Sequence, residues 1–242
     1  MQRLVDIHCH IIPEVDDGAA SIRETANLLQ KEYQDGVTEI ILTPHFRRGM
    51  FETPQDVIEK QFAKVQRMVQ RSRTGMKVYL GCEYHMHPQM VQDLNENRRP
   101  TMAGSRYVLL EFSSLHSYAQ IRNQVYVLAA SGYVPIIAHV ERYPCLLKRP
   151  ALIRELCELG AKIQLTSDSV LGEEGWQIRQ FCRLLLKEHW VDYIATDAHN
   201  MRERSPQLQK CARYVESKFG EKYAEKIFIC NPRKIIKDGK ER

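Results

Sequence analysis

The sequence lacks several features that whole classes of protein require. Its longest apolar runs, such as VYVLAA, are too short to span a bilayer, so we expect no membrane insertion. The segment MQRLVDIHCH lacks the long apolar stretch of a signal peptide, and we therefore expect a cytoplasmic protein. The seven cysteines are scattered without a CxxC pair, which argues against a disulfide framework and against a thiolate zinc site.

The overall composition is that of a globular chain with a packed core. Its 242 residues are 43% apolar and 27% charged, and no low-complexity segment, flexible linker or short internal repeat divides them. We expect a single domain over residues 1–242. The net charge of +5 permits an anionic substrate without demanding one. No basic run with interleaved aromatic residues indicates a nucleic-acid surface, so we expect no nucleic-acid partner.

Strand-like and helix-like segments alternate along the chain. Helical periods and caps predict intervening helices, for example from Ser21 to Gly36, from Thr53-Pro54 onwards and over 118–131. Such alternation predicts parallel strands joined by right-handed crossovers. The fold class we expect is therefore α/β, as a distorted TIM-like (β/α)7 barrel. An open doubly wound sheet is the alternative, but no GxGxxG or P-loop pattern follows a strand. The seven expected strands are 3–8, 37–43, 76–83, 107–112, 134–140, 161–166 and 191–196.

Residue types that bind metals follow six of the seven expected strands. In parallel barrels the active site forms where the strands end, so these side chains should converge on one face. A single histidine or glutamate there is more often a hydrogen-bonded cap, but six of seven ends is hard to reach by accident. The sixth strand, which ends QLTSDS, is the one that adds no residue to this set. The residues are His8 and His10, His45, Glu83, Glu111, His139, and Asp197 with His199, while Asp16-Asp17 lies in the loop after the first strand.

The composition of this set indicates a divalent metal site. Because it contains imidazoles and carboxylates but no cysteine, it favours hard-to-intermediate divalent ions, which are manganese, iron, zinc or magnesium. Carboxylates able to bridge, such as Glu83 and Glu111, indicate more than one ion. The EYHMH segment repeats the HxH pattern with His85 and His87, but it follows the strand end, and we interpret these two as exposed or as substrate-rim residues.

Several motifs together resemble a known family. DIHCHIIPEVDDGA, TPH, IIAHVERY and ATDAHN are similar to motifs of the PHP superfamily. With RRGMFETP, SRYVLLEF and NPRKI they more closely resemble the bacterial manganese-dependent tyrosine-protein phosphatases of the CpsB/CapC type, found in capsule and exopolysaccharide clusters. The similarity runs over nearly the whole chain. GCEYHMH and LTSDSVLG depart from the usual pattern on the expected active face, which puts the substrate preference in doubt more than the metal chemistry.

The resemblance implies a PHP fold with three Mn²⁺ ions and a specific distribution of ligands. The first ion would be held by His8, His10, Glu83 and Asp197, the second by Glu83, Glu111 and His139, and the third by Asp17, His45 and His199.

A mechanism follows as a hypothesis. A hydroxide that bridges two ions would attack the phosphorus of a phosphotyrosine. Arg142 in HVERY, and as a weaker candidate Arg204 after DAHN, would bind phosphate oxygens through their planar guanidinium groups. The tyrosyl leaving group is fairly acidic, and Asp197 is a candidate for supplying a proton where one is needed. By resemblance, the partner would be the C-terminal tail of a bacterial tyrosine kinase that controls polysaccharide export.

Alternatives remain at this point. A histidinol-phosphate phosphatase or another small-molecule phosphoesterase would use the same metals, as would a metal-stabilised scaffold protein without activity. A cysteine-dependent phosphatase is excluded, because none of the seven cysteines is followed by arginine six positions later. The segment SIRETANLL resembles a first helix that contacts neighbours in ring assemblies, and a surface helix explains it equally well. A homo-oligomer is therefore one alternative for the oligomeric state.

Overall fold

The computed structural model describes residues 3–242, so only residues 1–2 of the expected domain lie outside it. Its strands all pair in parallel and form two sheets, as expected for a distorted barrel. One sheet has the order β1-β2-β4 and the other the order β3-β5-β6-β7-β8-β9. The strands are β1 (Leu4–Asp6), β2 (Val37–Leu42), β3 (His45–Phe46), β4 (Lys77–Leu80), β5 (Glu83–His85), β6 (Tyr107–Glu111), β7 (Val134–Ile137), β8 (Lys162–Thr166) and β9 (Tyr193–Ala195).

One of the seven expected strands is interrupted, and another is followed by a short strand that was not expected. The expected strand 37–43 is observed as β2, and the chain continues beyond it as β3 after Thr43-Pro44, where proline has no N–H for the ladder. The segment 76–83 is interrupted, because it ends as β4 and resumes as β5 after Gly81-Cys82. Each of these two connections transfers the chain from the smaller sheet to the larger one. The expected strand positions are therefore correct, but the strand predicted over 76–83 is not continuous.

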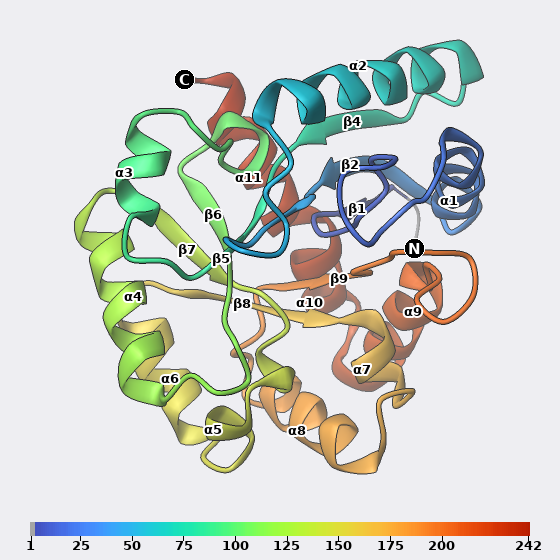
Figure 1. Ribbon diagram of the computed structural model, residues 1–242. Helices are drawn as coiled ribbons and strands as arrows, with labels where there is room; N and C mark the ends of the chain where they lie inside the picture. Colours follow the sequence, from blue (N-terminus) through green and yellow to red (C-terminus); the bar gives the residue numbers. More distant parts are fainter. Residues whose placement is uncertain (1–2) are drawn as a thin grey trace.

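Helices surround the strands on the outside of the molecule (Figure 1). Ser21 and Ser117 cap two of them by accepting hydrogen bonds from the third helical residue, as the sequence predicts for Ser21. The helices are α1 (Ile22–Gln34), α2 (Gln55–Ser72), α3 (Met90–Asn95), α4 (Tyr118–Ala130), α5 (Pro144–Leu147), α6 (Ala151–Glu158), α7 (Ser167–Leu171), α8 (Trp176–Lys187), α9 (Leu208–Phe219), α10 (Glu221–Glu225) and α11 (Asn231–Lys240), with the short turns η1 (Met102–Gly104), η2 (Val140–Arg142) and η3 (Lys226–Cys230). Within residues 3–242, no helix has both the length and the apolar character needed to cross a membrane.

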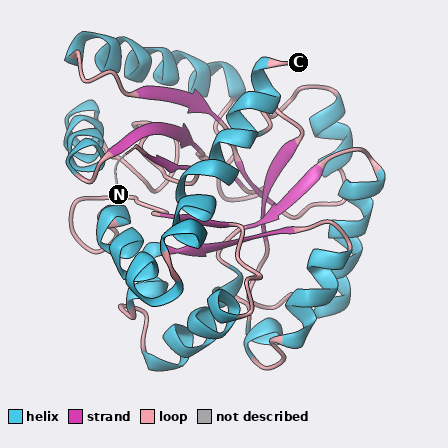
Figure 2. Ribbon diagram, turned by 180° about the vertical axis from the view of Figure 1, so that it is seen from behind, coloured by secondary structure: helices cyan, strands magenta, loops and turns pink. Residues whose placement is uncertain are grey.

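The C-terminal helix covers one end of the strand assembly. Figure 2 shows α11 lying across the strands when the molecule is seen from behind. Ile235 and Ile236 of α11 belong to a buried cluster with strand residues such as Leu109 and Ile136, and with Met102 of η1. Because apolar side chains fill this end, the polar residues are left at the opposite end, where the strands finish.

We predict that Gly239→Ala lowers the free energy of unfolding by about 1–3 kcal/mol through overpacking. Helix propensity alone favours alanine. However, a Cβ at position 239 would lie 2.0 Å from the backbone oxygen of Ala103, because α11 packs closely against η1. Urea unfolding measures the difference. Lys237→Ala, on the exposed side of the same helix, is the control and should change stability by less than about 0.5 kcal/mol. A stabilised Gly239→Ala variant would contradict this packing.

Candidate metal centre

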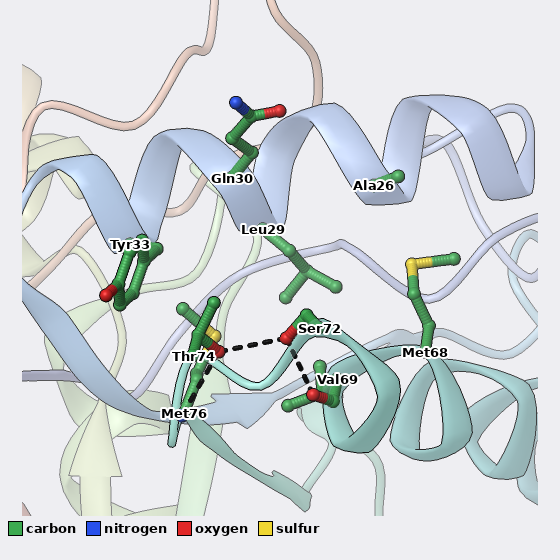
Figure 3. A pocket seen from close by; sticks show the side chains of 9 residues that line it. All are labelled: Ala26, Leu29, Gln30, Tyr33, Met68, Val69, Ser72, Thr74 and Met76. Atoms are coloured by element: carbon green, nitrogen blue, oxygen red, sulfur yellow. Dashed lines mark hydrogen bonds between the residues drawn. The ribbon is translucent and has the colours of Figure 1, made fainter.

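A polar cavity of about 250 Å³ lies at the carboxyl ends of the strands. It contrasts with a second cavity of about 380 Å³ between α1 and α2, which is lined by residues such as Leu29, Met68 and Met76 and by no ionisable group other than Tyr33 (Figure 3). Of these two cavities, only the one at the strand ends therefore has charged groups suited to metal or phosphate chemistry. Its lining comprises Asp17, His45, Arg47, Met50, Phe51, Glu83, Glu111, His139, Arg142, Asp197 and Arg204.

Glu83 lies at the centre of this site and is fully buried. Its Oε2 is 3.2 Å from Nε2 of both His8 and His10 and 2.9 Å from Nδ1 of His45. Its Oε1 is 2.8 Å from Nε2 of His139. The register of β3 against β5 pairs His45 directly with Glu83, so strand pairing itself sets part of this geometry.

The electrostatics around Glu83 favour the ionised carboxylate. Burial alone would raise the pKa of Glu83, but the charges of His8 and His45 and the nearby imidazoles of His10 and His139 hold it well below its usual range. His199 shows the opposite tendency for an imidazole, because burial and the nearby His10 lower its pKa to about 4. A lowered pKa favours the neutral imidazole of His199, which is the form whose ring nitrogen can bind a cation.

Asp197 joins the imidazoles to two arginines. Its Oδ1 is 3.3 Å from Nε2 of His8 and 3.4 Å from Nε2 of His10. Its Oδ2 accepts hydrogen bonds from Nη1 of Arg142 at 2.7 Å and from Nη2 of Arg204 at 2.5 Å. Burial raises the pKa of Asp197, but the surrounding His8, His10 and arginines hold it well below its usual range. An ionised Asp197 favours a ligand role over the proton-donor role that the sequence suggested.

The expected ligand residues lie together, in three overlapping groups of ligand atoms within 4.8 Å of one another. The first group is the expected His8, His10, Glu83 and Asp197. The second and third differ in detail from the expectation, because His45 joins Glu83 and Glu111, and His10 joins Asp17, His45 and His199. His139 is in none of these groups but contacts Glu83 directly.

The buried polar atoms of this site fit divalent cations. Oε2 of Glu83, Oδ1 of Asp197 and Nε2 of His199 are buried without a hydrogen-bond partner in the described chain, as are Nδ1 of His45 and Oε2 of Glu111. Nε2 of His8 and Nε2 of His10 face each other at 3.3 Å, where at most one of them can donate a proton. Burying so many polar atoms without a partner costs free energy, and a cation bound between these atoms would give all of them a partner.

In His8, His10 and His199 the other ring nitrogen, Nδ1, forms a hydrogen bond away from the cavity. His8 Nδ1 donates to Gln164 Oε1 at 3.2 Å, His10 Nδ1 to Asp16 Oδ2 at 2.8 Å, and His199 Nδ1 to the carbonyl oxygen of Asp197 at 2.9 Å. Such contacts fix the tautomer and turn the free Nε2 lone pair toward the ion. The sequence predicts no role for Asp16 beyond its place in the loop, and Gln164 is not predicted because the sixth strand offers no imidazole.

Asp16 also fixes the loop that follows β1. Its two carboxylate oxygens accept from the backbone N–H of Gly18 at 3.0 Å and of His45 at 2.9 Å. A Cβ at position 18 would lie 2.1 Å from the carbonyl oxygen of His10, so only glycine permits this close approach. The loop places Asp17 Oδ1 at 3.5 Å from Nε2 of both His45 and His199.

The two histidines of the EYHMH segment do not join the metal-ligand groups. His85 lies beside His116, with ring centroids 5.9 Å apart, and burial and the nearby Arg47 lower its pKa to about 4. His87 accepts a hydrogen bond from the backbone N–H of Gln89 in the following turn. Their positions agree with the interpretation that they lie outside the ligand set.

Comparisons with known proteins identify similar sequences and one similar family model. The family model described as "Capsular polysaccharide synthesis, CpsB/CapC" matches residues 4–237. The tyrosine-protein phosphatase CpsB of Streptococcus pneumoniae is 35% identical over 240 residues, covering 97% of this chain and 99% of that protein. The tyrosine-protein phosphatase YwqE of Bacillus subtilis is 30% identical over 217 residues, covering 90% and 85%.

A solved structure of the same kind superposes closely. It comes from work on YwqE from Bacillus subtilis and CpsB from Streptococcus pneumoniae, described as unique metal-dependent tyrosine phosphatases. The TM-score is 0.91 at 28% identity, with 97% of this chain and 95% of that chain covered. The α/β barrel expected from the sequence is thus confirmed.

We predict that His139→Ala binds fewer metal ions per chain than the unmodified protein, because it removes the imidazole that faces Glu83 Oε1. His85→Ala is the matched control. It removes an imidazole from β5, the strand that also carries Glu83, but takes no ligand atom from the three groups. Elemental analysis after dialysis against manganese measures both. Equal metal content in the His139→Ala variant and the unmodified protein would exclude His139 as a ligand.

Proposed function

Because the chain belongs to the CpsB/CapC family of capsular polysaccharide synthesis proteins, we propose that it is a metal-dependent protein-tyrosine phosphatase. The observation that carries this proposal is the convergence of nine ligand-type side chains and three arginines, Arg47, Arg142 and Arg204, at one polar cavity. The matching relatives are named tyrosine-protein phosphatases and are matched over most of their length, which supports the same activity here. One domain over residues 1–242 would carry the whole reaction.

The residues proposed to hold metal are His8, His10, Asp17, His45, Glu83, Glu111, His139, Asp197 and His199. Mn²⁺ is the proposed ion, at up to three per chain, with iron, zinc, magnesium or cobalt as alternatives that the donor set also accepts. Such ions, when bound, acidify coordinated water and neutralise charge on phosphoryl oxygens. The oxygen and nitrogen donors, without sulfur, support this range of metals.

The arginines are proposed to bind the phosphoryl group. Arg142 and Arg204 line the cavity, and each retains N–H groups beyond the one given to Asp197. A guanidinium presents paired donors that match two oxygens of a phosphate. Since the phenol of tyrosine has a pKa of about 10, it leaves more readily than an alcohol. The reaction therefore needs less help from a general acid, which is consistent with the ionised Asp197.

The rim of the cavity supports an aromatic substrate. Phe51 stacks on His45 with centroids 5.0 Å apart and an interplanar angle of 10°. Met50, also in the lining, is 63% exposed. Backbone hydrogen bonds between Arg47 and Phe51 hold this turn in place. An exposed thioether beside the phosphate position offers apolar contact to a phenyl ring, which an alkyl phosphate cannot use.

The protein substrate is proposed from the family alone. We infer that it is a phosphotyrosine-containing protein, specifically the C-terminal tail of a bacterial tyrosine kinase that regulates capsule or exopolysaccharide synthesis. A cytoplasmic location and a homo-oligomeric state belong to the same proposal.

We predict that the manganese-loaded protein hydrolyses a phosphotyrosine peptide, and that chelation of the metal abolishes the activity, because the ionised ligands alone do not activate water. Phosphate release is measured with phosphotyrosine peptide and with histidinol phosphate, each with and without Mn²⁺. Preference for histidinol phosphate would favour the small-molecule phosphoesterase. No hydrolysis of either compound would favour a scaffold protein.

We predict that Met50→Ala lowers kcat/KM for a phosphotyrosine peptide about fivefold, which corresponds to about 1 kcal/mol of lost apolar contact. Its kcat/KM for a phosphoserine peptide should stay unchanged, since that substrate has no ring to contact. Met201→Ala is the control, because Met201 is 40% exposed and lies outside the cavity lining. An equal loss for both substrates would rule out Met50 as a specificity residue.

A further inference from the structure

Arg142 is held on two sides by carboxylates, only one of which belongs to the cavity. Nη1 donates to Asp197 Oδ2 at 2.7 Å. On the other side, Nη2 and Nε both donate to Oε1 of Glu174, at 2.7 and 3.3 Å. Asp197 lines the cavity, whereas Glu174 does not. Glu174 thus contacts the guanidinium from outside the space that a substrate would occupy.

Glu174 is itself fixed by a chain of polar contacts. It lies between α7 and α8, and its Oε2 accepts from Ser169 Oγ at 2.8 Å. Ser169 Oγ is 2.7 Å from Thr166 Oγ1, which in turn lies 2.8 Å from Oε1 of the buried Glu141. The N–H of Thr166 also donates to Glu141.

This series of contacts ends at Glu141, the residue that precedes Arg142 in the sequence. Glu141 and Arg142 are adjacent in η2, immediately after the candidate ligand His139. The side chains from Glu141 through Thr166 and Ser169 to Glu174 therefore form a closed polar ring with Arg142. Such a ring restricts the rotamer of a long, flexible side chain before substrate arrives, so less conformational entropy is lost on binding.

The number of donors leaves Arg142 free to bind phosphate. A guanidinium has five N–H groups. Three of them point to Glu174 and Asp197, so two remain for phosphoryl oxygens. A carboxylate that occupied the cavity would compete with phosphate and repel it. Glu174 stands behind the guanidinium and therefore orients it without blocking the cavity.

We propose that Glu174, supported by Ser169, is a positioning residue that holds Arg142 in the orientation needed to bind the phosphoryl group. This inference rests on the phosphatase function proposed above. Both residues lie in or next to the LTSDSVLG segment, whose departure from the family pattern the sequence analysis related to substrate preference. The role differs from that of a catalytic residue, because Glu174 acts on substrate only through Arg142.

The adjacent Glu173 provides a matched control. Its carboxylate accepts hydrogen bonds from Gln207 at 2.9 Å and Lys210 at 3.2 Å on the exposed side of the loop, and it makes no hydrogen bond to Arg142 in the described chain. Glu173→Ala removes the same chemical group one residue away. Any effect of loop loosening or of net charge alone should therefore appear in both variants.

The test compares Glu174→Ala, Glu174→Gln and Glu173→Ala in the manganese-loaded protein. Glu174→Ala should raise KM for a phosphotyrosine peptide about tenfold, with kcat within about twofold and metal content unchanged. Glu174→Gln retains an acceptor oxygen for Nη2 and should recover part of this loss. Glu173→Ala should leave both constants unchanged. In an Arg142→Ala background, Glu174→Ala should have no further effect on KM.

Binding of inorganic phosphate, measured by calorimetry on the same proteins, gives a readout that does not need turnover. Its Kd should rise about tenfold in Glu174→Ala, in parallel with KM. Three results would overturn the positioning role. These are a lower KM in Glu174→Ala, an equal change of KM in Glu173→Ala, or additive effects on KM when Glu174→Ala is combined with Arg142→Ala. If no phosphoester is hydrolysed but phosphate binding still depends on Glu174, the phosphatase proposal fails and the positioning role stands.

Discussion

The site depends on one constraint, which is that the buried carboxylate of Glu83 faces four imidazoles at once. Hydrogen bonds within the chain do not satisfy this arrangement, because Glu83 Oε2 remains without a partner and two of the imidazole nitrogens face each other. Divalent cations between these atoms would remove the conflict, since each lone pair would then have a positive partner. Metal binding to such a preformed group would also stabilise the folded chain, because an unfolded chain holds no comparable site.

The candidate ligands lie on both sides of the gap between β1 and β9, where the sheet does not close. β1 and β9 do not pair as strands, and the only β-bridge between their extensions in the described chain joins Cys9 to Ala198. Asp6 spans this seam by accepting from the N–H of Thr196 at 3.1 Å and from its hydroxyl at 2.5 Å. Burial and the neighbouring Asp6 raise the pKa of Glu32 well above its usual range, which favours a protonated carboxyl behind the seam. Ions that join His8 to Asp197 would therefore close the barrel as well as serve chemistry.

Sequence analysis found the ligand candidates because each follows a strand whose apolar pattern is clear. The parallel alternation then implies that strand ends meet, and His45 and Glu83 do lie in register. It could not find Gln164 or Glu174 in the same way. Glutamine and glutamate are common surface residues, and their roles follow only from which side chain lies opposite in three dimensions. The short strand β3 and the break between β4 and β5 were also missed, because two residues are too few to show a strand period and a short interruption at Gly81-Cys82 leaves the apolar pattern intact.

Asp197 connects the two halves of the proposed chemistry. Its Oδ1 faces the imidazoles of His8 and His10, while its Oδ2 faces Arg142 and Arg204. A positive φ of 53° at Asp197 holds the carboxylate at this junction at some cost in backbone strain. A cation bound on the Oδ1 side would withdraw negative charge from the carboxylate and so weaken its hydrogen bonds to the two guanidinium groups. Their N–H groups would then be more available to an anion, so that metal and phosphate would favour each other's binding through this one side chain.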